Sequence, residues 1–249
     1  MATSSSIEWT DTTWNPVTGC TRASDGCELC YAVSMTRRLA AMGQEKYSGL
    51  INPGKGHFNG VVKEHWASLD EPLRWRKPRR VFVNSMSDLF HPGISDEFIL
   101  EVFDRMRRAS QHHFQVLTKR PERTLAMEHL IDWPDNVWMG TSVEDSQVVE
   151  RIDALRQTGA RIKFLSCEPL IGPLGEIDLT GIDWVIAGGE SGPGARPMDE
   201  EWVKDLRDAC DRADVAFFFK QWGGVRKKMA GRELEGRTHD DYPVALAAA

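Results

Sequence analysis

The chain has 249 residues, of which 41% are hydrophobic and 27% charged, and its formal net charge is −6. This composition excludes a disordered or fibrous chain, and the acidic balance argues against a bulk electrostatic grip on nucleic acid while leaving a local basic groove open. No apolar run approaches the roughly 20 residues needed to span a bilayer, and residues 1–6 lack the pattern of a signal peptide, so we expect a cytoplasmic protein with no membrane partner.

After a short first strand expected within residues 7–17, three of the five cysteines fall within eleven residues. Cys20, Cys27 and Cys30 have the spacing C-x6-C-x2-C. Cytosolic thiols stay reduced, so clustered cysteines favour metal binding over disulfides. Three thiolates from one loop suit a tetrahedral zinc with a distant fourth ligand, or an iron–sulfur cluster in which one iron lacks a protein ligand. The residues alone leave these two centres open, together with three ordinary free thiols.

Beyond the cysteines, hydrophobic periodicity predicts helices and strands that alternate along the chain. Residues 32–42 are predicted as a helix that ends at Gly43, and residues 47–60 as a loop. The remaining predicted strands are 80–84, 114–118, 137–141, 162–166, 184–188 and 215–220, and the remaining helices are 96–106 with Ser95 as N-cap, 122–130, 147–157 and 200–212.

Alternation of this kind is typical of βαβ units and a parallel sheet. About seven strands are fewer than the eight of a closed barrel. We therefore predict a single-domain α/β fold, a partial (β/α)6–7 TIM-like barrel, with a doubly wound open sheet as the alternative. The barrel is expected over residues 1–225 with the cysteine loop at 14–31, and residues 226–249 as a polar C-terminal tail with an Ala-rich end.

Polar and charged side chains follow nearly every predicted strand. Ligands bind at the carboxyl ends of the strands in parallel α/β folds, so we expect these side chains and the cysteine loop on one rim. Cys210 and the pair His112 and His113 are expected to be structural. The predicted rim residues are Asn84, Ser85, Ser87, Asp88, Thr118, Lys119, Arg120, Thr141, Ser142, Glu144, Ser166, Cys167, Glu168, Gly188, Gly189, Glu190, Ser191, Lys220, Gln221 and Trp222.

Several short segments carry a family resemblance. The chain resembles the phage-associated three-cysteine-motif proteins, a family of unassigned function related to radical S-adenosylmethionine enzymes and, more distantly, to spore photoproduct lyases. The first gap between cysteines is six residues here, where three are usual in the radical enzymes. The matching segments are 14–20 (WNPVTGC), 27–32 (CELCYA), 83–90 (VNSMSDLF), 117–121 (LTKRP), 140–144 (GTSVE), 166–170 (SCEPL), 188–192 (GGESG), 219–223 (FKQWG) and 231–237 (GRELEGR).

This resemblance implies that Cys20, Cys27 and Cys30 hold a [4Fe-4S] cluster. Its open iron would bind S-adenosyl-L-methionine, which one electron cleaves to a deoxyadenosyl radical. By analogy with the lyases, Cys167 is the expected catalytic hydrogen donor. The implied cofactor-binding residues are Asn84, Ser85, Ser87 and Asp88 for the methionine part, Ser142 and Glu144 for the ribose, and Glu168 and Glu190 for the ribose or substrate.

The function predicted from these residues is a radical S-adenosylmethionine enzyme of lyase or transferase type. It would repair or modify a nucleic-acid base, with an electron donor and with nucleic acid or a separate protein as partner. Phosphate contacts are expected from a basic rim, and base stacking from an indole. These substrate-binding residues are Lys119, Arg120, Lys220 and Trp222, with Arg76, Lys77, Arg79 and Arg80 nearby.

Two alternatives stay open at this point. One is a non-catalytic nucleic-acid- or protein-binding module with a structural zinc or cluster. The other is a hydrolase that uses Asp88, Glu144 and Glu168 with a divalent metal, which leaves the cysteines without a role.

Overall fold

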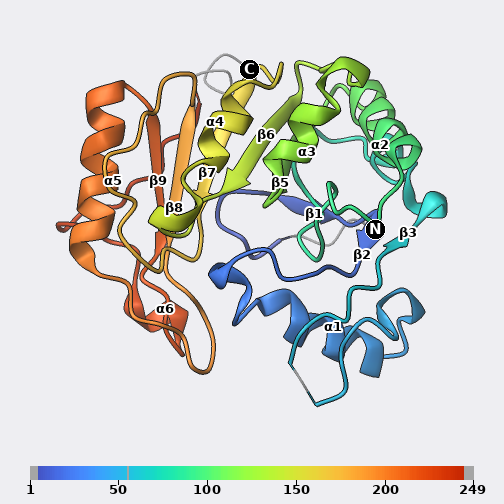
Figure 1. Ribbon diagram of the computed structural model, residues 1–249, viewed down its shortest axis with the longest axis horizontal. Helices are drawn as coiled ribbons and strands as arrows, with labels where there is room; N and C mark the ends of the chain where they lie inside the picture. The colour runs from blue at the N-terminus through green and yellow to red at the C-terminus, as the bar shows by residue number, and fades with distance from the viewer. Residues whose placement is uncertain (1–4, 55, 244–249) are drawn as a thin grey trace.

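The computed structural model describes residues 5–54 and 56–243. Seven parallel strands form one sheet in the order β1-β4-β5-β6-β7-β8-β9. The sheet curls into a half-barrel, with β1 and β9 at its two open edges (Figure 1). The strands are β1 (Thr12–Trp14), β4 (Arg80–Val83), β5 (His113–Thr118), β6 (Val137–Ser142), β7 (Ile162–Cys167), β8 (Trp184–Gly188) and β9 (Ala216–Gln221).

The helices lie outside the sheet and at its carboxyl end. In Figure 1, α2 to α5 lie around the sheet, and α1 and α6 lie below it. A short antiparallel pair, β2 (Val17–Thr18) with β3 (Lys63–Glu64), leads the chain toward α1. The helices are α1 (Tyr31–Ala41), α2 (Asp96–Arg108), α3 (Pro121–Ala126), α4 (Arg151–Arg156), α5 (Glu200–Ala213) and α6 (Lys227–Ala230), and the 3-10 turns are η1 (Asp25–Cys27), η2 (Glu45–Tyr47), η3 (Trp66–Ser68), η4 (Pro72–Arg74), η5 (Glu128–Leu130) and η6 (Ser146–Val148).

The longer helices begin at side-chain caps and bury one face. Ser95 caps α2 by accepting a hydrogen bond from the backbone N–H of Phe98, and Asp199 does the same for Glu201 in α5. Such caps satisfy N–H groups that the first helical turn leaves without partners. The apolar side chains of both helices recur at helical spacing and pack against the sheet. These two helices therefore form where the periodicity predicts them.

Alternate strand residues divide between two apolar clusters, one on each face of the sheet. On the helix side, residues such as Val81 and Val83 pack with the buried faces of α2, α4 and α5. On the concave side, the cluster is largely aromatic. Its buried members are Trp9, Phe82, Trp138, Ile162, Phe164, Trp184, Ile186 and Phe218. Because bulky rings fill the hollow of the half-barrel, the sheet needs no eighth strand to bury its inner face.

The structure confirms the predicted half-barrel of parallel strands and shows an open sheet without the doubly wound arrangement. The predicted helix 147–157 is split into η6 and α4. The segment 168–183 between β7 and β8 is neither helix nor strand, although a barrel would place a helix there. Among the described residues, no helix is long and apolar enough to cross a bilayer.

Much of the predicted C-terminal tail packs against the barrel. The N–H of Phe219 donates to the carbonyl of His239, and the N–H of Asp241 to that of Phe217, so this segment covers the outer edge of β9. Leu234 is buried in the helix-side cluster. The predicted Ala-rich end and the N-terminal segment judged for a signal lie largely outside the described residues.

Candidate metal centre

The predicted cysteine loop, 14–31, includes the end of β1, all of β2 and the first residue of α1. The part between β2 and α1, residues 19–30, is called the cysteine loop from here on, and it runs across the carboxyl ends of the main sheet. At its start Gly19 has φ +87°, and a Cβ there would lie 2.0 Å from the carbonyl oxygen of Val61. Only glycine fits this position. At its end Cys30 is the N-cap of α1, and its carbonyl accepts a 3.1 Å hydrogen bond from the N–H of Val33. Local turn geometry therefore sets both ends of the loop.

The three loop thiols are free and partly buried. Burial, the Asp88 carboxylate and the other two thiols raise the pKa of Cys20 to about 12, against the Arg120 charge. Burial also raises the pKa of Cys30. For Cys27 burial acts in the same direction, but the Lys119 ammonium and local backbone hydrogen bonds lower its pKa overall. Without a metal, the three thiols therefore do not all ionise readily, and Cys27 is the one that the surrounding charges favour as a thiolate.

A first support of the loop is the pair Arg120 and Asp88. The Arg120 guanidinium donates to Asp88 Oδ2 at 2.7 Å and to Thr21 Oγ1 at 2.8 Å. Asp88 also accepts from Thr118 Oγ1 at 2.7 Å and from the N–H groups of Phe90 and Lys119. Both carboxylate oxygens are therefore occupied by protein donors, and the guanidinium links β5 to the residue after Cys20.

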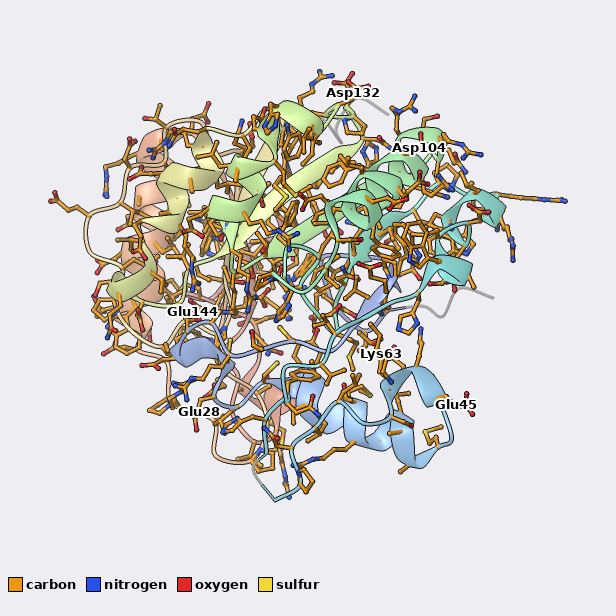
Figure 2. All side chains as sticks on the ribbon, turned by 45° about the vertical axis from the view of Figure 1, so that its right-hand side comes forward. Glu28, Glu45, Lys63, Asp104, Asp132 and Glu144 are labelled. Atoms are coloured by element: carbon orange, nitrogen blue, oxygen red, sulfur yellow. The ribbon has the colours of Figure 1, made fainter. Side chains whose placement is uncertain are left out.

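A second support is Glu144, which follows β6 and is 1% exposed. Its carboxylate pairs with Arg151 at 3.0 Å and with Lys119, and it accepts a 2.8 Å hydrogen bond from Ser24 Oγ. Gly26 packs directly on it, because a Cβ there would lie 2.5 Å from Glu144 Cγ. Figure 2 labels Glu28 of the loop below Glu144.

Burial shifts the pKa of the lysine beside Glu144. It lowers the pKa of Lys119 to about 8, although the thiols Cys27 and Cys30 and the Asp88 carboxylate favour its charged form. The ammonium therefore lies between the buried carboxylate of Glu144 and the cysteine loop. A positive charge at this position favours the thiolate form of the neighbouring sulfur atoms.

A third support is the pair Glu190 and Arg196. The guanidinium donates to both carboxylate oxygens, at 2.6 and 2.9 Å, and a further N–H donates to the carbonyl of Asp25 at 3.1 Å. Gly189, next to Glu190, lets the backbone at the end of β8 approach the backbone at Trp222, because a Cβ on Gly189 would lie 2.0 Å from the Trp222 carbonyl oxygen. In this structure Gly189 therefore packs against the chain itself.

The residues predicted for the methionine part of a cofactor hold the strand before the loop. Asn84 Oδ1 accepts from the N–H of Val17 at 3.2 Å, and Ser87 Oγ donates to the Val17 carbonyl at 2.8 Å. Ser85 Oγ bonds to Asn15 Oδ1 at 3.2 Å. Ser142 is buried, and its carbonyl accepts from Arg151.

Glu168 and Tyr31 lie together at the carboxyl rim. Glu168 pairs with Lys220 at 2.8 Å and accepts from the Trp9 indole N–H at 3.1 Å, on the concave side of the sheet. The Tyr31 hydroxyl donates to the carbonyl of Ser85 at 2.5 Å, and the ring is 50% exposed. Burial of the hydroxyl, with the charges of Cys30 and Glu168, raises the pKa of Tyr31. Sequence reasoning missed Tyr31 as a site residue, although it follows the last loop cysteine directly.

Cys167 ends β7, but its side chain points to the helix side of the sheet and not to the concave side. Its side chain is 0% exposed and packs in the helix-side cluster with Cys210, because alternate residues of β7 point to opposite faces. Burial raises its pKa well above the ordinary value. The predicted role of Cys167 as hydrogen donor at the site therefore has no support in its position.

The predicted phosphate-gripping residues are engaged within the protein. Lys119, Arg120 and Lys220 each pair with a carboxylate. The Trp222 indole donates to the Glu233 carbonyl and packs edge-on against Phe219. Arg76, Lys77 and Arg79 precede β4, and Arg80 is its first residue, so they lie at the amino ends of the strands and not beside the rim, contrary to our expectation. Their predicted contacts with substrate stay untested.

Sequence reasoning also missed the two arginines that support the loop. Arg151 begins α4 and Arg196 lies in the segment before α5, seven and six residues after Glu144 and Glu190 respectively. A buried arginine is expected only beside an acid, but nothing in the sequence pairs these residues. Among the described residues, no three His, Cys, Asp or Glu side chains are arranged to hold a single metal ion.

The molecule is thus an α/β half-barrel that carries a three-cysteine loop over the carboxyl ends of its strands. Residues 4–243 match the model of a family described as "Protein of unknown function (DUF5131)", and the chain belongs to this family. No match was found among curated proteins.

Solved structures similar to the chain include a spore photoproduct lyase complexed with dinucleoside spore photoproduct, with 13% sequence identity and a TM-score of 0.45. They also include a doubly substituted mutant of spore photoproduct lyase with bound AdoMet and dinucleoside spore photoproduct, with 12% identity and a TM-score of 0.46. Each match covers 85% of this chain and 64% of the lyase chain.

Proposed function

We propose that this chain is an iron–sulfur protein that uses S-adenosyl-L-methionine to repair or modify a nucleic-acid base. The observation that carries the proposal is that one supported loop carries three free thiols over the carboxyl ends of a parallel sheet, with Cys27 and Cys30 near enough to raise the pKa of Cys20. Soft thiolates are the usual ligands of iron–sulfur clusters. A cluster is wider than one ion, so its ligands stand further apart than the ligands of a single metal ion.

The proposed ligands are Cys20, Cys27 and Cys30, which leave one iron of a cube cluster without a protein ligand. A cluster of this kind with S-adenosylmethionine supplies reductive cleavage of a sulfonium. The chain's own contribution is a cation, Lys119, that favours thiolate at Cys27. Glu168 and Lys220 form an ion pair on the concave side of the rim, where a polar molecule bound at the strand ends would meet them.

A nucleic-acid substrate is supported by the outer face of α1. Tyr31, Met35 and Met42 are large exposed apolar side chains at helical spacing. Arg37 and Arg38 are also exposed on α1, with Arg38 on the same helix face, and no described residue forms an ion pair with either. The sequence from Tyr31 to Gln44 contains no acidic residue. Unpaired guanidinium groups on the same helix as an exposed ring suit phosphates and an unstacked base.

The catalytic part of the proposal is tested by cofactor cleavage. Protein reconstituted with iron and sulfide without oxygen, then given S-adenosylmethionine and a one-electron reductant, is expected to form 5′-deoxyadenosine. The Cys27→Ser variant should form none, and the Cys210→Ser variant, changed far from the loop, should match the wild type. Absence of 5′-deoxyadenosine from protein with an intact cluster would remove the catalytic claim.

The nucleic-acid part is tested by the double variant Arg37→Glu/Arg38→Glu. We expect weaker binding of a fluorescent single-stranded oligonucleotide, and a salt-dependence slope smaller by about 1.4, because two phosphate contacts are lost. The matched control is Arg107→Glu/Arg108→Glu on α2, where both arginines already pair with Asp104. Equal binding by wild type and both variants would contradict a role for α1.

A further inference from the structure

Three strand-end carboxylates share one arrangement that their predicted cofactor roles do not explain. Asp88, Glu144 and Glu190 follow β4, β6 and β8, and each is almost fully buried. Each carboxylate holds an arginine: Arg120, Arg151 and Arg196 respectively.

The contacts reach the cysteine loop at three successive points. The first pair meets Thr21 through Arg120, the second meets Ser24 through Glu144 itself, and the third meets the Asp25 carbonyl through Arg196. These points all lie between Cys20 and Cys27. The loop segment that separates the first two thiols is therefore held from three different strands.

The carboxylates have little capacity left for a ligand. Each oxygen of Asp88, Glu144 and Glu190 already accepts a hydrogen bond or ion pair from a protein group. A ligand could bind here only by displacing one of these donors, which would break a charge-assisted contact of a buried carboxylate. Binding a cofactor ribose directly is therefore unfavourable for these three residues.

We infer that Asp88, Glu144 and Glu190 are positioning residues that hold the cysteine loop in its ligand-ready conformation before any metal arrives. The six residues between Cys20 and Cys27 would otherwise be free, and fixing each backbone costs conformational entropy. Prior ordering by the fold removes part of that cost from metal binding. The inference rests on the proposed function only for the identity of the metal.

The test uses the metal-free full-length chain and amide hydrogen exchange. In Asp88→Asn, Glu144→Gln and Glu190→Gln we expect exchange of residues 20–30 to quicken roughly tenfold or more, with β5 to β8 unchanged, since each variant weakens a charge-assisted contact. The control Asp104→Asn changes a carboxylate on α2 that pairs with three arginines of the same helix and forms no hydrogen bond or ion pair with the described residues of the cysteine loop. It should leave the loop unaffected.

Milder variants guard against misfolding. Ser24→Ala removes only the loop side of the Glu144 contact, and should still quicken exchange at residues 20–30. Arg196→Lys keeps the charge but not the paired donors, so it should lie between wild type and Glu190→Gln. Loop exchange that is unchanged in all variants, or that rises only together with exchange of the whole sheet, would overturn the inference.

Reconstitution with iron and sulfide separates this inference from the proposed function. If the wild type binds no cluster while the variants loosen the loop, the cluster proposal fails and the positioning role stands. If all variants bind iron and sulfide as fully as the wild type, with a protected loop, the positioning role fails and the cluster proposal stands.

Discussion

At the scale of single residues, the five cysteines divide into two groups by their environment. Cys20, Cys27 and Cys30 are partly exposed on the loop, whereas Cys167 and Cys210 are fully buried between the sheet and the helices. Thiol reagents attack only thiolates that they can reach. The two groups should therefore differ in reactivity in the folded protein.

We predict that a thiol reagent labels Cys27 fastest in the folded, metal-free protein, because its pKa is lowered, and Cys20 and Cys30 more slowly, because theirs is raised. The buried Cys167 and Cys210 should react only in denaturant, where all five thiols are labelled. Mass spectrometry of the labelled peptides identifies the reactive cysteines. Rapid labelling of Cys167 in the folded state would contradict its burial and restore it as a candidate hydrogen donor.

Cys167→Ala should lower the free energy of unfolding by about 1 kcal/mol through lost packing, without loss of iron.

Gly26 shows how tightly the loop packs on the rim. A methyl group there would overlap the Glu144 side chain, whose carboxylate is fixed by Arg151 and Lys119. We predict that Gly26→Ala lowers the free energy of unfolding by about 1–3 kcal/mol, as overpacking does elsewhere. Urea unfolding measures this loss. A free energy of unfolding equal to that of the wild type would contradict the packing.

The residue types of the rim were predictable from the sequence, but their partners were not. A polar residue after an apolar strand indicates the carboxyl end of that strand, which is why Asp88, Glu144 and Glu190 were singled out. Whether such a carboxylate meets a ligand or an arginine depends on contacts distant in the chain. Arg120, Arg151 and Arg196 supply those contacts, and no local pattern announces them.

At the scale of elements, the strands were easier to predict than the helices. Parallel strands that are buried on both faces are short continuous apolar runs, such as Val81–Val83, and such runs can be recognised in the sequence directly. The segments after β6 and β7 were harder. A 3-10 turn interrupts the predicted helix 147–157, and residues 168–183 form no helix although the barrel pattern favours one.

The packing of β6 on β7 gives an element-scale prediction. Gly140 on β6 lies opposite Phe164 on β7, and a Cβ at Gly140 would lie 2.4 Å from the ring. Gly140→Ala should therefore lower the melting temperature by several degrees, since about 1–3 kcal/mol is lost. Scanning calorimetry measures the shift. Phe164→Leu in the same chain should relieve part of the strain, so strictly additive losses would contradict the contact.

At the scale of the whole molecule, several histidines are built into the core in their neutral form. Burial lowers the pKa of His112, His113 and His239 below the ordinary 6.5. As pH falls below about 6.5, the unfolded chain binds these protons before the folded chain does. Stability contributed by the neutral rings is therefore present above that pH and is lost as pH falls toward their folded-state pKa.

We predict that the urea midpoint decreases between pH 7.5 and 5.5. The variant His113→Phe should flatten this dependence, because it removes one titrating group and keeps a ring against Trp138, whose centroid is 5.6 Å from that of His113. Unfolding followed by tryptophan fluorescence at three pH values is sufficient. A midpoint that rises as pH falls would contradict the sign.

The fold places one loop with three free thiols over the strand ends, and the iron content of the protein tests most directly our proposal that these thiols hold a cluster. Purification and reconstitution without oxygen, followed by iron, sulfide and zinc analysis, should give brown protein with about four irons and four sulfides per chain. Cys27→Ser should lose this content and Cys210→Ser should keep it. Colourless protein with about one zinc per chain, or with no metal, would contradict the account.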